Sequence, residues 1–406
     1  MAFGLEQMDC LTKEEIGINA HFMRLMNLSG TFSRRKQTRL RSAIIWSVIY
    51  VPLILLQVAT CIHFGKNFDL LAYALHHVVL ITAAYIVNVL AVYVYWKEIH
   101  DIMEGTTMSY NYDSGLVKNF VQQTIHERFK LSGLLVKLVS YGSVGVIIEV
   151  QIFFVIEEFY LQTYQTIFPM YVPMDLNDPF VFTSVVIWQE LVVLYTTYLP
   201  MMLIVLYYNA WSHLDVEIKI LNFAVANIQK IVEEESQNYC HEGIHRETLE
   251  AALYETYSYH FAKHHAHIAS YFELFSKSVK VFTLLLFTMG PICLVTVGLS
   301  LLSDNIGIRL KLFWFLVIQL IMTYAICWIG QYIADVSTGI SEVLVTAPWW
   351  LMPKSCRSTF LLIITRCRKP FQITTVHGVP ANMESFMDLL KGVYQIISVV
   401  IQMRDG

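Results

Sequence analysis

Long apolar runs alternate with polar segments along the chain. Because a helix rises about 1.5 Å per residue, about 20 mostly apolar residues are needed to cross the hydrocarbon core of a bilayer. Seven runs are long and apolar enough, at about residues 43–64, 70–96, 134–156, 184–208, 279–302, 312–334 and 384–406. The pattern therefore predicts an all-α membrane protein with seven transmembrane helices.

The polar stretches between these runs divide the chain further. Residues 209–278 follow a helical pattern but are too polar to cross a membrane, as in EIKILNFAVANIQKIVEEE. The predicted order is a polar N-terminal segment, spans one to four, a helical polar segment, spans five and six, a second polar segment and the last span. These parts occupy residues 1–42, 43–208, 209–278, 279–334, 335–383 and 384–406.

Basic residues are distributed unevenly between the two sides of the predicted membrane. Lys and Arg number seven in residues 1–42, four in 97–133 and five in 335–383, whereas residues 157–183 contain none. Segments rich in Lys and Arg stay in the cytoplasm. The N-terminus is therefore predicted to be cytoplasmic and, after seven crossings, the C-terminus extracellular.

The last span is amphipathic. Its apolar side contains Phe386, Leu389, Leu390, Val393, Ile397, Val400 and Ile401. The opposite side carries two series with a seven-residue spacing, Ser385–Gly392–Val399 and Asp388–Gln395–Gln402, and ends at Met403. Such a stripe predicts several like helices around an aqueous axis. The alternative is that these polar groups bond to a neighbouring helix of the same subunit.

Composition excludes several other classes of function. Hydrophobic residues make up 56% of the chain and charged residues 15%, against about 25% charged in soluble domains. A net charge of −4 gives no basic face for nucleic acid, and the seven cysteines show no paired short spacing. The sequence contains no HExxH, phosphate loop or Gly-x-Ser-x-Gly motif, so neither an enzyme nor a cofactor is expected.

Three histidines in the predicted segment 209–278 share one helix face. His260, His264 and His267 are spaced i, i+4, i+7, which is compatible with metal binding. Histidines on one face of such a helix are more often structural. No metal site is therefore expected.

The end of the chain resembles the insect odorant receptor family over residues 341–403. The resemblance lies in a tryptophan pair, a basic stretch, an apolar helix, an Arg-x-x-x-Pro element, a turn and an amphipathic last helix. These are Trp349 and Trp350, Lys354–Arg357, Phe360–Ile364, Arg366–Pro370, Thr374–Gly378 and Met383–Met403. The seven spans and their predicted orientation also fit this family.

The resemblance implies a ligand-gated, non-selective cation channel in the plasma membrane, in the dendrite of a sensory neuron. It implies a heterotetramer with a shared co-receptor subunit, in which the last helix of each subunit lines one pore. The implied gate is Val399, Gln402 and Met403, with Gln395 and Gly392 on the same stripe. The family often carries Thr-Tyr where this chain has Gln395 and Ile396, which leaves the packing behind the gate open.

The resemblance also implies that a volatile odorant binds in the outer half of the bundle formed by residues 43–208 and 279–334. The expected contacts come from spans two, three, four and six. They are Tyr73, His77, Ile147, Gln151, Trp188, Leu191, Tyr195, Phe315, Gln319 and Met322. Apolar walls with a few polar groups suit a small volatile molecule, although aromatic residues at helical spacing also serve as packing.

Two other functions remain open at this stage. A gustatory-type channel of the same superfamily would work as a homomer on less volatile ligands. A metabotropic seven-helix receptor would place its N-terminus outside. The predicted orientation disfavours that reading, and the acidic-Arg-aromatic triplet that usually ends the third span of such receptors is absent here.

Overall fold

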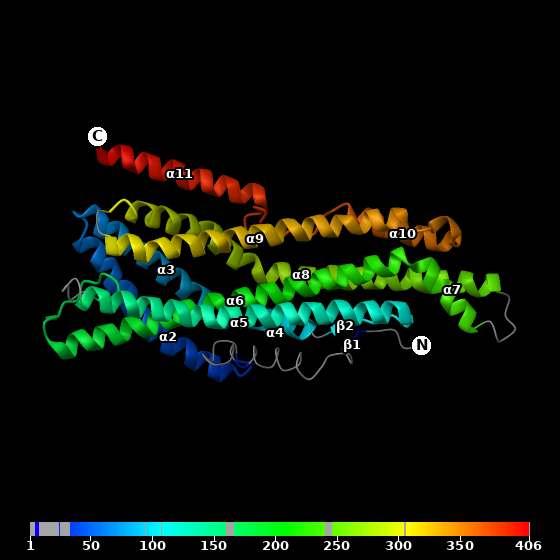
Figure 1. The fold of residues 1–406 in the computed structure, drawn as a ribbon, viewed down its shortest axis with the longest axis horizontal. Helices are drawn as coiled ribbons and strands as arrows, with labels where there is room; N and C mark the ends of the chain where they lie inside the picture. Colours follow the sequence, from blue (N-terminus) through cyan, green and yellow to red (C-terminus); the bar gives the residue numbers. More distant parts are fainter. Residues whose placement is uncertain are drawn as a thin grey trace.

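Helices aligned with the long axis of the molecule make up most of the structure (Figure 1). A computed structural model describes residues 5–7, 24, 33–93, 95–106, 108–159, 166–239, 246–303 and 306–405, and some side chains within these helices, most of them between 139 and 159, lie outside this description. The helices are α2 (Lys36–His63), α3 (Phe68–Tyr93), α4 (Trp96–Gly105), α5 (Gly115–Phe159), α6 (Pro179–Ala226), α7 (Ile228–Tyr239), α8 (Arg246–Ser300), α9 (Ile306–Thr346), η2 (Trp349–Leu351), α10 (Lys354–Cys367) and α11 (Met383–Asp405).

A short sheet joins the chain start to the α4–α5 connection. Strand β1 (Leu5–Gln7) pairs with β2 (Met108–Tyr110) in antiparallel register, with Leu5 opposite Tyr110. The apolar pattern of the sequence did not predict this pair, because three-residue strands carry no readable periodicity.

Six of the described helices are long and apolar enough to cross a membrane. The segments are Lys36–His63, Leu70–Leu90, Pro179–Ala226, Arg246–Ser300, Ile308–Thr346 and Met383–Met403. The remaining predicted span, residues 134–156, lies within α5, where most side chains are outside the description. Large apolar side chains such as Val48, Leu55 and Ile62 are exposed on α2, as expected of a surface that faces lipid.

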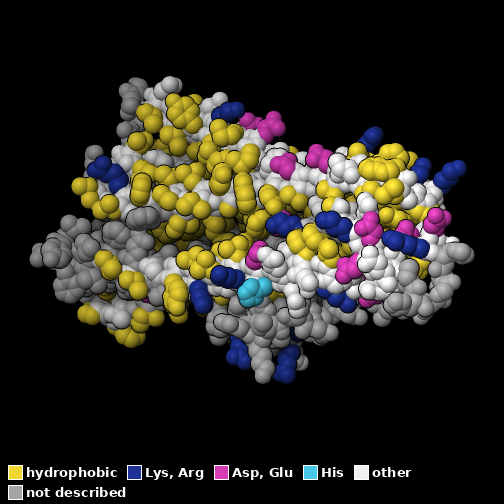
Figure 2. All heavy atoms as spheres, turned by 45° about the vertical axis from the view of Figure 1, so that its right-hand side comes forward, with side chains coloured by type: hydrophobic (Ala, Val, Ile, Leu, Met, Phe, Trp, Pro, Cys, Tyr) yellow, Lys and Arg dark blue, Asp and Glu magenta, His cyan; other side chains and the backbone are white. Residues whose placement is uncertain are grey.

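Four helices are much longer than a bilayer is thick. The longest, α8, has 55 residues, which at about 1.5 Å per residue is more than twice the ~30 Å hydrocarbon core. The predicted boundaries at 208/209, 278/279 and 334/335 therefore fall inside α6, α8 and α9. Apolar side chains gather over one half of the molecule and charged ones over the other (Figure 2).

Aromatic side chains of residues 209–278 pack against other parts of the same chain. Phe223 on α6 stacks on Phe120 of α5, with ring centroids 4.0 Å apart. Phe272 on α8 stacks on Phe371, which follows α10, at 4.7 Å. The long polar extensions of the helices thus share one continuous core with the bundle.

The start of α11 is fixed by a cap and a close backbone contact. The side-chain oxygen of Asn382 accepts a hydrogen bond from the Ser385 amide at 2.9 Å, as in a helix N-cap. Just before it, the carbonyl of Ala381 lies directly against Gly330 of α9, where any Cβ would collide with it. A glycine at position 330 is therefore required for the chain to pass this close to α9.

Candidate functional site

A cavity of about 400 Å³ lies within the helix bundle. This volume is in the ~300–1,000 Å³ range of small-molecule sites. Helices α3, α6, α8 and α9 form most of the wall, with contributions from α4 and α5. Representative lining residues are Leu80, Val87, Ile204, Tyr207, Phe282, Leu286, Met289, Gln319, Met322 and Ile326.

The wall is almost entirely apolar. Among the described residues, no charged side chain lines the cavity. The hydroxyls of Ser278 and Thr283 donate to carbonyls of their own helix, those of Phe275 and Val279, at 2.8 and 2.9 Å. Such a surface favours the binding of an uncharged, mostly apolar ligand.

Gln319 of α9 brings an amide to the wall opposite a glycine of α8. A Cβ on Gly290 would lie 3.2 Å from the side-chain nitrogen of Gln319. Among the described residues, the side-chain amide of Gln319 makes no hydrogen bond to protein. The amide can therefore both donate to and accept from a molecule in the cavity.

Of the residues predicted from sequence to contact a ligand, Gln319 and Met322 line this cavity. Tyr73 and Phe315 instead belong to a separate buried cluster with Val297, Ile308 and Leu312. His77 stacks on Phe168, with ring centroids 5.1 Å apart.

The predicted residues of α6 face α2 or the molecular surface. Trp188 donates its ring N–H to the carbonyl of Ile49 at 3.1 Å, and Tyr195 stacks on Trp46 at 3.5 Å. Leu191 is exposed. The side chains of Ile147 and Gln151 lie outside the described residues.

The sequence did not predict that α8, which contains span five, contributes to the cavity wall. Ligand contacts were expected only from spans two, three, four and six. The available signal was Gly290 followed by Pro291 inside an apolar run, because a helix-interior glycine leaves room for a neighbouring side chain. His76 was also absent from the residues predicted to contact a ligand. Its ring is buried between Thr296 and Phe315, and its Nε2 has no partner among the described residues.

The last helix packs on α8 and α9, two of the helices that line the cavity. Phe386 and Val393 are buried, and Phe386 meets Tyr324 of α9 edge to face at 5.8 Å. Ile397 lies over Gly298 of α8. In Figure 1, α11 runs along the edge of the molecule beyond α9. Any shift of α8 relative to α9 therefore changes the surface on which α11 packs.

The predicted stripe of α11 faces away from the bundle. Gln395, Val399, Gln402 and Met403 are exposed, and a Cβ added to Gly392 would meet nothing within 4 Å. The opposite face holds the buried Phe386 and Val393. The pore-lining role of this stripe stays a prediction.

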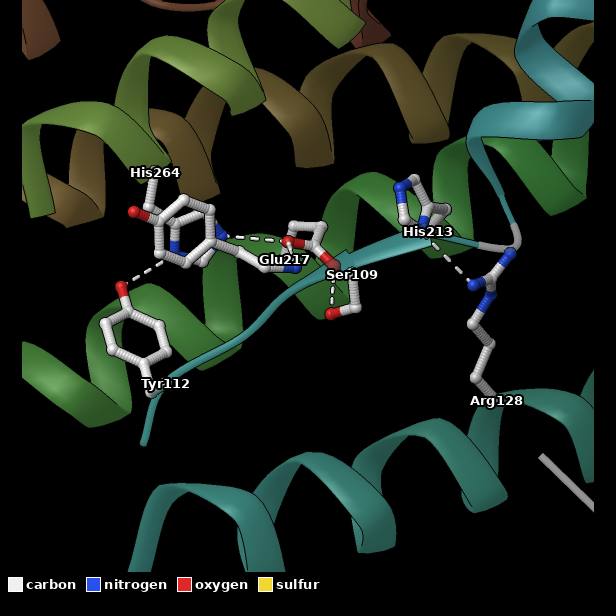
Figure 3. Close-up of polar contacts among 7 residues, drawn as sticks. Ser109, Tyr112, Arg128, His213, Glu217 and His264 are labelled. Atoms are coloured by element: carbon white, nitrogen blue, oxygen red, sulfur yellow. Dashed lines mark hydrogen bonds and ion pairs between the residues drawn. The ribbon is translucent and has the colours of Figure 1, made fainter. Parts of the chain in front are cut away.

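A buried polar cluster lies where α6 and α8 leave the bundle (Figure 3). The carboxylate of Glu217 accepts hydrogen bonds from Ser109 Oγ at 2.6 Å and from His264 Nε2 at 2.8 Å. His264 Nδ1 lies 2.8 Å from the hydroxyl of Tyr112. Burial opposes ionisation of Glu217, but His264, His213 and Ser109 together hold its pKa at about 2.

The neighbouring Arg128 is also fully buried. Its guanidinium donates to His213 Nδ1 at 3.2 Å and to the carbonyl of Thr106 at 3.1 Å. Burial, followed by the charge of Arg128, lowers the pKa of His213 to about 3, so His213 is neutral and accepts this bond. These contacts join α5 to α6 and to the end of α4.

The histidine face predicted on α8 is used in this cluster. His260 and His264 bond to the hydroxyls of Tyr110 and Tyr112, each at 2.8 Å. Within the described part of the chain, no group of three or more potential ligands is arranged to hold a metal ion.

The chain resembles proteins of known structure. Its fold is similar to that of the insect olfactory receptor OR5 from Machilis hrabei in complex with eugenol, with a TM-score of 0.74 and 11% identity over 96% of this chain and 100% of that one. The structure of OR5 described without eugenol gives 0.73 and 12% over the same shares. This likeness confirms the predicted all-α fold with seven transmembrane helices.

Sequence comparison agrees with the fold. The chain is 22% identical to odorant receptor 19a and to putative odorant receptor 19b of Drosophila melanogaster over 142 residues, which is 34% of this chain and 37% of the length of each relative. The family model described as 7tm Odorant receptor matches residues 75–394, which confirms the resemblance seen at the end of the sequence. Because that model covers most of the chain, from α3 into α11, the chain belongs to the 7tm odorant receptor family.

Proposed function

We propose that this chain is the odorant-binding subunit of a non-selective cation channel that it forms with the shared co-receptor subunit. Its family consists of olfactory receptors, not enzymes. One observation carries the proposal: the cavity is walled by α8 and α9, and α11 packs on these same two helices. We place the complex in the plasma membrane of a sensory neuron, with the N-terminus cytoplasmic and the C-terminus extracellular.

The cavity is the proposed odorant site. Gln319 and Met322 are its direct contacts from the predicted set. The other predicted residues are retained as a proposed outer part of the site, toward the extracellular helix ends. They are Tyr73, His77, Ile147, Gln151, Trp188, Leu191, Tyr195 and Phe315.

Gating follows from the placement of α11. A ligand opens the channel only if it binds the open arrangement of α8 and α9 better than the closed one. The exposed stripe with Gly392, Gln395 and Gln402 is proposed to line the pore. Val399 and Met403 are proposed to close it by dewetting, since apolar constrictions exclude water and ions.

The test is expression in oocytes with and without a co-receptor, with inward current recorded during exposure to volatile esters, alcohols, aldehydes and aromatics. The variant Leu286→Trp fills the cavity and should abolish the odorant response at unchanged surface expression. The matched control is Ile292→Trp on the same helix, whose side chain is exposed on the outer surface. This control should respond like the native chain.

Two results would count against the proposal. One is the absence of odorant-evoked current from a co-receptor complex that reaches the cell surface. The other is an unchanged response in Leu286→Trp. Current of full size without the co-receptor would favour a homomeric, gustatory-type channel.

A further inference from the structure

The cavity wall restricts the charge of its ligand. Among the described residues, none of the lining side chains is charged. Moving an ionised carboxylate or ammonium into such a space leaves its charge without a counterion, which is costly. A ligand of this cavity is therefore neutral.

The wall also restricts the number of polar groups. The hydroxyls of Ser278 and Thr283 donate to carbonyls of their own helix. The hydroxyl of the lining residue Tyr207 is buried and has no partner among the described residues. Cys293 offers only a thiol, which is a weak hydrogen-bonding group.

Among the described lining residues, only Gln319 carries a side-chain amide. Its nitrogen lies where the missing side chain of Gly290 leaves room, 3.2 Å from the position a Cβ would take. Buried polar groups gain stability when they are paired, and an amide paired by a ligand discriminates against ligands that lack a partner group. The Gln319 amide thus gives a ligand a polar partner that can both donate and accept in a mostly apolar wall.

Size gives the remaining restriction. At the packing density of a protein interior, a cavity of about 400 Å³ accommodates on the order of 10–15 non-hydrogen atoms. Smaller volatiles would leave part of the apolar wall without contacts, which weakens binding.

We propose that the cavity selects a neutral, mostly apolar molecule of roughly 10–15 non-hydrogen atoms that carries one oxygen function, an alcohol or a carbonyl, hydrogen-bonded to Gln319. This inference rests on the proposed function, since it takes the cavity to be the odorant site. Gln319 is then the residue that determines specificity for the oxygen function, and carboxylic acids and amines of the same length are excluded.

The test uses ligands of one chain length: decane, 2-decanone, 1-decanol, decanoate and decylamine. Binding is measured as the rise in unfolding temperature of the purified full-length chain in lipid nanodiscs, since a ligand that binds the native state raises this temperature. The ketone and the alcohol should stabilise the native chain at concentrations about tenfold lower than decane, which is the size of one hydrogen bond. The acid and the amine should have no effect.

Two variants isolate the amide. Gln319→Leu replaces the amide with an apolar side chain and should remove the preference for ketone over alkane while decane binding is retained. Gly290→Ala crowds the amide and should reduce the same preference. The control Gln331→Leu changes a glutamine of the same helix that is bonded to Asp335 at 2.9 Å, away from the cavity, and should keep the native preference.

The outcomes separate the two proposals. Equal stabilisation by decane and 2-decanone in the native chain, or an unchanged preference in Gln319→Leu, would overturn the inference. Failure of the native chain to bind any of the neutral ligands would also overturn it. The expected binding preference together with a complete lack of evoked current in the co-receptor complex would leave the inference standing and reject the channel function.

Discussion

Ile397 of the last helix lies so close to Gly298 of α8 that a Cβ on the glycine would be 2.6 Å from the isoleucine Cδ1. Atoms at that separation overlap, so an alanine at 298 must displace Ile397 or rotate its end. The last helix is thus held against α8 at a position where only hydrogen fits.

Gly298 and Gly330, which lie against Ile397 and Ala381, should differ in their tolerance of alanine. In Gly298→Ala the atom in the way is the end of a flexible side chain, so a partial loss of odorant-evoked current is expected. In Gly330→Ala the obstacle is the backbone carbonyl of Ala381, so the start of α11 must move, and current should be abolished. Oocyte recording with surface labelling measures both.

The control for these glycines is Gly339→Ala. An added Cβ there meets nothing within 4 Å, although Gly339 lies in α9 like Gly330. Current like that of the native chain is expected. Equal responses in all three variants would show that the contact between α11 and the bundle does not control gating.

Cysteines substituted along the exposed stripe of α11 should show whether the stripe contacts water. Gln395→Cys and Val399→Cys, expressed with the co-receptor, should react with membrane-impermeant thiol reagents and lose current, faster when odorant is present. Val393→Cys on the buried face should stay unmodified. Inert cysteines at 392, 395, 399 and 403, at rest and during stimulation, would argue against a pore along α11.

Loss of charge at Glu217 should destabilise the fold more than loss of charge at the surface. The carboxylate is 2% exposed and bonded to Ser109, His264 and the Tyr110 amide, so Glu217→Gln leaves buried donors poorly matched. A loss of about 2–4 kcal/mol in the free energy of unfolding is expected. The exposed Glu247→Gln on α8 is the control and should change it by less than about 0.5 kcal/mol. Unfolding in nanodiscs measures both, and equal losses would contradict the role given to Glu217.

Acidification should weaken the fold in two stages. His213 has a pKa of about 3 in the folded chain, below its ordinary 6.5, so the unfolded chain takes up a proton first and stability falls as the pH drops from 6.5 toward 3. Glu217, with a folded pKa of about 2 against 4.5, contributes stability above pH 4.5 that is lost as the pH falls toward 2.

Replacing His213 isolates the first stage. In His213→Gln the pH dependence between 6.5 and 4.5 should be shallower than in the native chain, by up to about 1.4 kcal/mol per pH unit. His265, whose pKa burial lowers to about 4, contributes in the same direction and is unchanged in this comparison. Unfolding temperatures measured at half-unit pH steps give the slopes, and identical slopes would mean that His213 is not buried as a neutral base.

The sequence by itself determined the helical class, the number of spans and the two faces of the last helix. These properties depend on run length and on periodicity along one helix, and both are local. The position of Phe386 and Val393 toward the bundle, with Gln395 and Val399 away from it, follows from the same local pattern.

Only the tertiary structure decided which helix faces meet. The sequence does not show that span four turns Trp188 and Tyr195 toward α2, where they contact Ile49 and Trp46. The wall formed by α8 around Gly290 and the pairing of Glu217 with His264 join residues far apart in sequence. Such pairings depend on how whole helices dock, and the energy of docking is a sum over the entire interface that no single stretch of sequence contains.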